Sequence, residues 1–186
     1  NAGDSTFVDV TVAAGLGDDR FSQGVAIGDV DSDGFPDLLV ANVGENRLYH
    51  NNGDGTFSEI TAETGTGGRR WTSSCVIADL NGDGLPDIFE VNYLGGQKIF
   101  DVICDAPGIV VGPSCNPRDF PPEADRFLLN TGDGKFIEHT TQAGFVGTDG
   151  RGLGVLVADL ENVGRLSVFV ANDTTANHFY VNRAAP

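Results

Sequence analysis

Four aspartates occur within nine residues in the segment DVDSDGFPD, which covers residues 29–37. They are Asp29, Asp31, Asp33 and Asp37. Carboxylates this close together repel one another unless a cation lies among them. In a tight loop, positions 1, 3, 5 and 9 of the spacing D-x-D-x-D-G-x-x-D turn toward one point. Gly34 at position 6 lets the chain reverse, and Phe35 at position 7 offers its carbonyl oxygen.

With water, this set supplies the roughly six to eight oxygen ligands that Ca²⁺ prefers. Magnesium requires a stricter octahedron, and a shell without His or Cys disfavours zinc and copper. A second copy reads DLNGDGLPD. Its expected ligands are Asp79, Asn81, Asp83, the Leu85 carbonyl and Asp87. The alternative for both segments is a solvated acidic turn without an ion.

The third copy, DLENVGRLS, begins at Asp159 but has Val163 at position 5 and Ser167 at position 9. We therefore predict two calcium ions and an empty third loop. The second copy also fits the EF-hand spacing, with Glu90 at position 12. Its flanks are strand-like rather than helical, so we interpret Glu90 as a strand side chain.

These loops belong to a longer repeat. The runs FVDVT, FSEIT and FIEHT begin at Phe7, Phe57 and Phe136, and a glycine follows each run four residues after its threonine. An apolar strand then ends at each loop, a second strand ends in Asn, and a third reads RLYHN, RFLLN or HFYVN. The N-G and D-G pairs between these strands supply the positive φ that tight hairpins need.

The pattern predicts an all-β fold of β-propeller blades, each with four antiparallel strands, and three repeats. A β-sandwich is the alternative, although sandwich strands seldom repeat their sequence. We expect one propeller-type domain over residues 1–186. Its repeats cover about residues 6–56, 57–135 and 136–183, with an insert at 94–125 between two strands of the second repeat.

The insert is rich in proline and contains two of the three cysteines. We expect a disulfide between Cys104 and Cys115 to hold it, and Cys75 to be a free buried thiol. Free thiols at all three positions are the alternative. Asn172 starts the sequon NDT and is a candidate glycosylation site, but it repeats Asn42 and Asn92, which favours a structural role.

The loops and repeats resemble the FG-GAP/VCBS repeats of integrin α-subunit propellers. The phrases DRFLLNTGDGKF, DGRGLGVLVADL and FVANDTTANHFYVN are more narrowly similar to the ASPIC/UnbV, or cartilage-acidic-protein-like, family. The resemblance implies a calcium-binding, secreted or cell-surface protein with a seven-bladed propeller. Three units are fewer than that propeller needs, so we expect two unpaired blade edges. Further blades of a longer chain would cover them, or another copy would, giving an oligomer or a filament.

The formal charge of −16 argues against nucleic acid or an anionic membrane as a partner, and no run of about 20 apolar residues is present to cross a bilayer. His50, His139 and His178 fall at different repeat positions and have no nearby nucleophile in the sequence. We therefore expect no enzyme. A calcium-binding structural or adhesive module ranks first, a carbohydrate- or protein-binding propeller domain second, and a hydrolase last.

Overall fold

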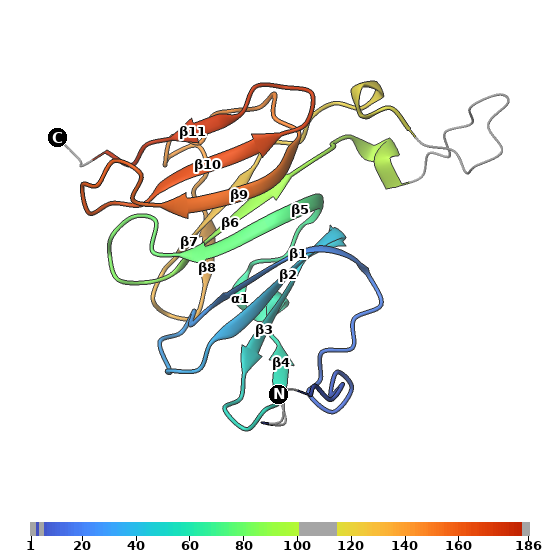
Figure 1. The fold of residues 1–186 in the computed structure, drawn as a ribbon, viewed down its shortest axis with the longest axis vertical. Coiled ribbons are helices and arrows are strands. Elements are labelled where there is room, and N and C mark those ends of the chain that lie inside the picture. The colour runs from blue at the N-terminus through green and yellow to red at the C-terminus, as the bar shows by residue number, and fades with distance from the viewer. Residues whose placement is uncertain (1–2, 4–5, 101–114, 184–186) are drawn as a thin grey trace, which may run out of the picture.

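A computed structural model describes residue 3 and residues 6–100 and 115–183. These residues form three antiparallel β-blades, as the repeats predict (Figure 1). Blade one contains β1 (Phe21–Gly28), β2 (Asp37–Glu45), β3 (Arg47–Asn51) and β4 (Phe57–Glu59). Blade two contains β5 (Arg69–Ala78), β6 (Asp87–Asn92), β7 (Arg126–Asn130) and β8 (Phe136–Glu138). Blade three contains β9 (Gly152–Ala158), β10 (Ser167–Asn172) and β11 (His178–Tyr180).

Within each blade, every strand pairs antiparallel with the next strand in the sequence. Blades one and two also meet along a short edge, where Val43, Gly44 and Glu45 of β2 pair with residues 69–71 of β5. Three short helices lie between the strands in the described residues. They are α1 (Thr61–Thr64), η1 (Gln97–Phe100) and η2 (Pro117–Asp119). None of the helices in the described residues is long and apolar enough to cross a membrane.

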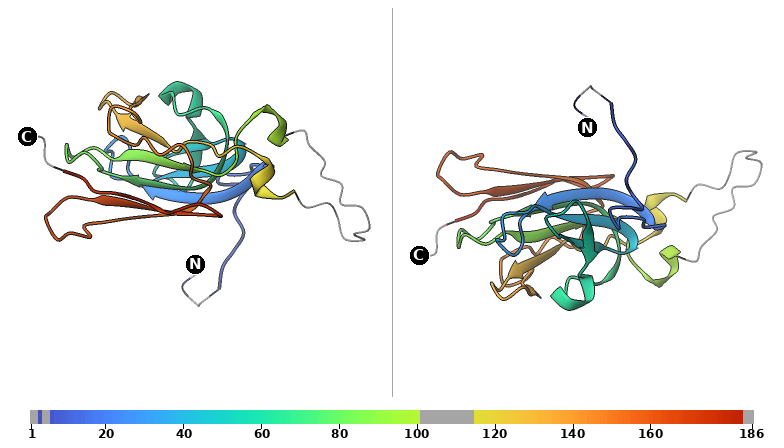
Figure 2. Two further views of the ribbon diagram at one scale, coloured as in Figure 1. Left: turned by 90° about the horizontal axis from the view of Figure 1, so that it is seen from above. Right: turned by 90° about the horizontal axis from the view of Figure 1, so that it is seen from below.

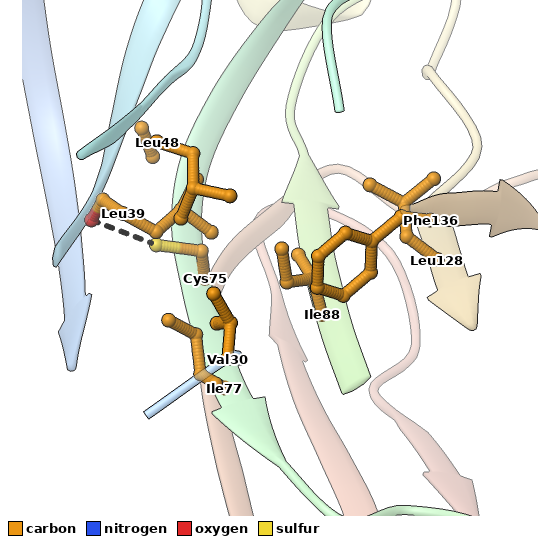
Figure 3. Close-up of a cluster of buried hydrophobic side chains, with 9 residues drawn as sticks. Val30, Leu39, Leu48, Cys75, Ile77, Ile88, Leu128 and Phe136 are labelled. Atoms are coloured by element: carbon orange, nitrogen blue, oxygen red, sulfur yellow. Dashed lines mark hydrogen bonds between the residues drawn. The ribbon is translucent and has the colours of Figure 1, made fainter. Parts of the chain in front are cut away.

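The core lies between the blades rather than within them. One buried cluster joins blades one and two and includes Leu39, Cys75, Ile77, Ile88 and Phe136 (Figure 3). A second cluster joins blades two and three and includes Phe89, Val91, Phe127, Val168 and Val170. Burial of apolar side chains on both faces of blade two therefore holds the three blades as one unit.

Adjacent blades approach closely at Gly28 of β1, which faces β5, and at Gly152 of β9, which faces β6. A Cβ atom on Gly28 would lie 2.3 Å from Cγ2 of Ile77, and one on Gly152 would lie 2.1 Å from Cγ1 of Val91. The Ser73 hydroxyl also donates to the Gly152 carbonyl over 2.6 Å. Only glycine allows this spacing between the backbones of adjacent blades.

The insert leaves blade two after β6 and returns at β7. Leu94 and Pro122 form an isolated bridge at its base, and Arg151 of blade three donates to the carbonyls of Pro117 and Phe120 at 3.2 and 2.9 Å. Cys104 lies outside the described residues, so its pairing with Cys115 stays a prediction.

One predicted strand is absent. Residues 6–10, the first copy of the fourth-strand sequence, form no strand, although the equivalent β4 and β8 do. β4 and β8 each pair with the third strand of their own blade. In the described part of the chain no strand is paired with residues 7–10, and a strand is defined by the backbone hydrogen bonds of such a pairing.

Candidate metal centre

The loop between β1 and β2 is held by its first aspartate. The Asp29 carboxylate accepts the N–H of Asp33 at 3.1 Å and of Gly34 at 2.9 Å. Gly34 has φ of 91°, a left-handed conformation that other residues rarely adopt. The chain therefore reverses at the position that the motif assigns to glycine.

The other two loops repeat this turn. Asp79 accepts the N–H of Asp83 at 3.1 Å and of Gly84 at 2.9 Å, and Asp159 accepts those of Val163 and Gly164 at 2.9 and 2.7 Å. The third loop thus keeps its shape without a carboxylate at position 5 or 9. Loop geometry and metal-binding capacity are consequently separate properties of this sequence.

The closing aspartates, Asp37 and Asp87, are fully buried. The two oxygens of Asp37 accept the N–H groups of Val30 and Asn51 at 2.8 and 2.9 Å. Asp87 accepts those of Leu80 and Asn130 at 3.1 and 3.0 Å. Burial raises the pKa of both carboxyl groups above the ordinary aspartate value. Each closing aspartate therefore ties the loop to the third strand of its blade.

In the first loop the carboxylates converge. Ligand atoms of Asp29, Asp31 and Asp37 lie within 4.8 Å of one another, and so do those of Asp31, Asp33 and His50. Among the described residues, these two sets are the groups of three or more His, Cys, Asp or Glu side chains whose ligand atoms lie this close together. In the second loop, Asn81 replaces one aspartate and donates to Asp83 at 2.8 Å.

His50 is a site residue that sequence reasoning missed. It lies on β3, as expected, but its Nδ1 is 3.3 Å from Asp31 Oδ2 and 3.2 Å from Asp37 Oδ1. The nitrogen is buried and makes no hydrogen bond. The sequence contains one indication of this position. His50 directly precedes Asn51, the asparagine that ends the third strand, and the Asn51 N–H binds Asp37 in the structure. The second repeat has Leu129 at the equivalent position, so its loop receives no imidazole.

The side chains at position 7 of the two intact loops, Phe35 and Leu85, lie against neighbouring turns. A Cβ atom on Gly53 would lie 2.8 Å from the Phe35 ring, and one on Gly132 would lie 3.2 Å from the Leu85 side chain. Position 7 of each intact loop therefore packs on the turn between the third and fourth strands of its blade.

Glu90 is a strand side chain and lies away from the loops. It is buried on β6, accepts a hydrogen bond from Asn46 of blade one at 2.8 Å, and lies 3.6 Å from Arg126. Burial raises its pKa, and the nearby Arg126 opposes that shift. The residue thus belongs to a polar contact between blades one and two.

Asn42, Asn92 and Asn172 share one structural role. Their side-chain amides donate to the carbonyls of Glu45, Ala124 and Ala176 at 3.0, 2.8 and 2.8 Å. Each therefore joins the end of the second strand to the residues that lead into the third strand of its blade, across a turn in blades one and three and across the insert in blade two. Glycosylation of Asn172 stays a prediction, and the amide that would carry a glycan is already engaged in this turn.

The side chains at the start of β5 contact other parts of the chain. The Trp71 indole donates to Gln23 at 2.9 Å, Arg70 pairs with Glu123, and Arg69 lies over the Phe100 ring at 4.3 Å. Cys75 is free and buried, and burial raises its pKa to about 12.

Comparison with known proteins agrees with this geometry. Residues 29–90 match a family model described as an FG-GAP-like repeat. The match starts at Asp29 and ends at Glu90, so it contains both complete acidic loops, β2 to β5 and the first part of β6. No curated protein matches the chain. Over residues 29–90, a third of its length, this chain is therefore similar to FG-GAP-like repeats, and its described residues form blades of a propeller type.

Proposed function

We propose that this protein is an extracellular calcium-binding module with a structural or adhesive role. The observation that carries the proposal is the convergence of Asp29, Asp31 and Asp37 within 4.8 Å in a loop whose design recurs in blade two. Three carboxylates in such proximity need a counter-charge, and a divalent cation supplies it.

The donor set suits calcium. The second loop offers only oxygens, from Asp79, Asn81, Asp83, Asp87 and the Leu85 carbonyl, and oxygen donors select hard cations. The first loop offers four carboxylates and the Phe35 carbonyl, with His50 beside them. When bound, the ions would neutralise both loops and lock the first hairpin of each blade. We expect no ion in the third loop, which retains only Asp159 and Glu161 of the acidic ligands.

Metal counting and thermal unfolding test the proposal. We expect two calcium ions per chain after gel filtration. Each should add about 2.7 kcal/mol to the free energy of unfolding at a calcium concentration of 100 times Kd. Asp33→Ala should remove one ion, whereas Glu161→Ala, a matched acidic change in the third loop, should remove none. A chain whose melting temperature does not respond to chelator would contradict the proposal.

The extracellular setting has two supports. FG-GAP-type repeats are typical of extracellular proteins. The sequence resemblance to the ASPIC/UnbV family implies the same setting. We further propose that Cys104 and Cys115 form a disulfide in that oxidising environment. Peptide mapping without reductant tests this pairing, and alkylation of both thiols would contradict it.

Ligand binding is the second candidate function, and one pocket favours it. A pocket of about 300 Å³ lies at the base of the insert, and Trp71 and Tyr93 line it with ring centroids 5.4 Å apart. Aromatic faces of this kind contact apolar surfaces of ligands, including sugars. Binding on a glycan array, lost in Trp71→Ala, would promote this candidate. We propose no catalytic role, and turnover that depends on a histidine would overturn that view.

A further inference from the structure

The pocket of about 300 Å³ at the base of the insert has one wall from blade two and one from the insert. Trp71 of β5 and Tyr93, which directly follows β6, form the wall of blade two. The other lining residues belong to the insert, and they are Leu94, Ile99, Cys115, Pro117 and Phe120. In both views of Figure 2, η1 and η2, coloured yellow-green and yellow, lie at one edge of the blades. The pocket therefore lies where the insert meets that edge.

The wall that the insert supplies is held by hydrogen bonds to its backbone. Arg151 of blade three donates to the carbonyls of Pro117 and Phe120 at 3.2 and 2.9 Å. The Gly95 N–H donates to the Pro121 carbonyl at 2.8 Å. Packed protein interiors leave few voids larger than a water molecule, and this space is far larger. The pocket is thus already formed without a ligand, which lowers the ordering cost of binding one.

The polar groups of the two aromatic side chains are already engaged. The Trp71 indole N–H donates to Gln23 at 2.9 Å, and the Tyr93 hydroxyl donates to Asp173 Oδ2 at 2.7 Å. The two insert carbonyls described above already accept hydrogen bonds from Arg151. Burying the hydroxyl groups of a sugar without new hydrogen bonds is costly, whereas an apolar side chain needs none. The pocket therefore favours an apolar side chain over a sugar ring.

Among the described blades, the aromatic pair occurs in the blade that carries the insert. Strand pairing gives the counterparts of Trp71 and Tyr93 in the other two blades. They are Phe21 with Val43 in blade one and Arg151 with Asp173 in blade three. A pair that only stabilised a blade would be expected to recur with the repeat. The pair instead accompanies the insert, yet the space between them shows that the insert does not pack fully against it.

One arginine at the edge of the pocket has no carboxylate partner. Arg69 is exposed and lies two residues before Trp71 on β5, so both side chains project from the same side of the strand. Its guanidinium carbon lies 4.3 Å from the centroid of the Phe100 ring, next to Ile99 of the pocket. Among the described residues, Arg69 forms no ion pair. A guanidinium over a ring keeps N–H groups at its edge that bind a carboxylate.

The carboxylates around Arg69 have other partners. Glu45 lies opposite Arg69 in the pairing of β2 with β5, but it pairs with Arg47 at 2.9 Å. Glu123 of the insert pairs with Arg70. The chain has a formal charge of −16, so an arginine without a carboxylate partner beside an apolar pocket is a local exception. It makes this edge complementary to an acidic ligand.

We propose that the pocket binds an acidic segment of a protein partner, with one large apolar side chain inside and Arg69 paired with a neighbouring carboxylate. A volume of about 300 Å³ is at the low end for ligand pockets and suits one side chain rather than an oligosaccharide. Buried apolar anchors supply most of the energy of protein contacts, and charge pairs at the rim supply specificity. The inference rests on the ligand-binding candidate above and assigns its ligand to protein rather than carbohydrate.

Peptide selection on the 186-residue chain with calcium present tests this ligand class. The probe is a phage-displayed library of random twelve-residue peptides without tryptophan, and synthetic copies of the enriched peptides are then titrated. Trp71 is the only tryptophan of the chain, so its fluorescence reports directly on the pocket. We expect enriched peptides that combine a large apolar residue with neighbouring acidic residues and that shift the Trp71 emission.

Two variants separate the two parts of the contact. Phe120→Ala removes part of the pocket wall and should weaken peptide binding at least tenfold. Arg69→Glu should also weaken it at least tenfold at about 0.05 M NaCl, and by less at about 0.5 M, where salt screens the charge pair. Arg183→Glu is the matched control, because it makes the same charge change on an exposed arginine. Its neighbour Asn182 contacts Leu80, beyond the far end of β5, so this variant should bind like the parent. Far-UV circular dichroism checks that each variant is folded.

The outcomes separate this inference from the function on which it rests. Basic rather than acidic enriched peptides, or binding that Phe120→Ala leaves unchanged, would overturn the inference. Glycans that need Trp71, with no peptide that shifts its emission, would support the ligand-binding candidate but exclude a protein ligand. An emission shift that grows with protein concentration alone would identify a second copy as the occupant and would also overturn it. If neither peptides nor glycans bind, the ligand-binding candidate fails as well, whereas the calcium count is measured independently.

Discussion

Asp125 is a buried carboxylate at a position where the other two blades have asparagine. Its Oδ1 accepts the N–H of Asn92 at 3.0 Å, as Asn46 accepts Asn42 at 2.8 Å and Asn177 accepts Asn172 at 2.9 Å. The change Asp125→Asn therefore keeps the hydrogen bond and the shape of the side chain. It removes the capacity to ionise and replaces the second oxygen by an amide NH2 group.

The expected effect depends on pH. Burial raises the pKa of Asp125 to about 6 from 3.8, although the nearby His178 opposes the shift. Because the folded pKa is raised, the folded state favours the neutral acid. Wild-type stability should therefore decrease as pH rises from about 4 to about 6, where the buried group must ionise. At 1.36 kcal/mol per pKa unit, the cost above pH 6 approaches about 3 kcal/mol.

Urea unfolding at pH 4.0 and pH 7.5 measures this difference. Asp125→Asn should gain up to about 3 kcal/mol over wild type at pH 7.5 and little at pH 4.0. Asp149→Asn is the control, because Asp149 also contacts His178, at 3.1 Å, but its side chain is 78% exposed. That variant should change stability by less than about 0.5 kcal/mol at either pH. An equal gain at both pH values, or a loss at pH 7.5, would refute burial as the cause.

Three further outcomes follow from the site and the core. The double change Val163→Asp and Ser167→Asp should restore the missing carboxylates, so metal analysis should find a third calcium ion, and an unchanged count would contradict the assigned ligands. His50→Leu copies Leu129 of the second repeat. It should keep both calcium ions but weaken competition by Zn²⁺ in calorimetry, because imidazole suits zinc, and unchanged competition would exclude His50 as a ligand. The Cys75 thiol, with its pKa raised to about 12, should react with a disulfide reagent only after unfolding, and prompt labelling of the native protein would show that it is accessible.

The sequence by itself predicted the elements that depend on short-range order. The loop at residues 29–37 and its copies are built from bonds within five residues of Asp29, Asp79 and Asp159, so their spacing was readable. The blades repeat because each pairs strands that follow one another along the chain, which alternating apolar runs and glycine turns reveal. The buried, free state of Cys75 was likewise predicted from its place in an apolar strand.

The tertiary structure decided whatever depends on neighbours from other strands or blades. His50 meets Asp31 only because β3 lies beside β2, and Glu90 meets Asn46 only because two blades pack together. Asp125 has an unusual pKa because its surroundings are buried, which local sequence does not show. Residues 7–10 have the sequence of a strand but form none, because strand formation depends on pairing with another backbone and local sequence does not show that pairing. The fold of each repeat can be predicted from its local sequence pattern. The pairing of distant strands, the burial of side chains and their charge environment depend on segments that meet only in the tertiary structure.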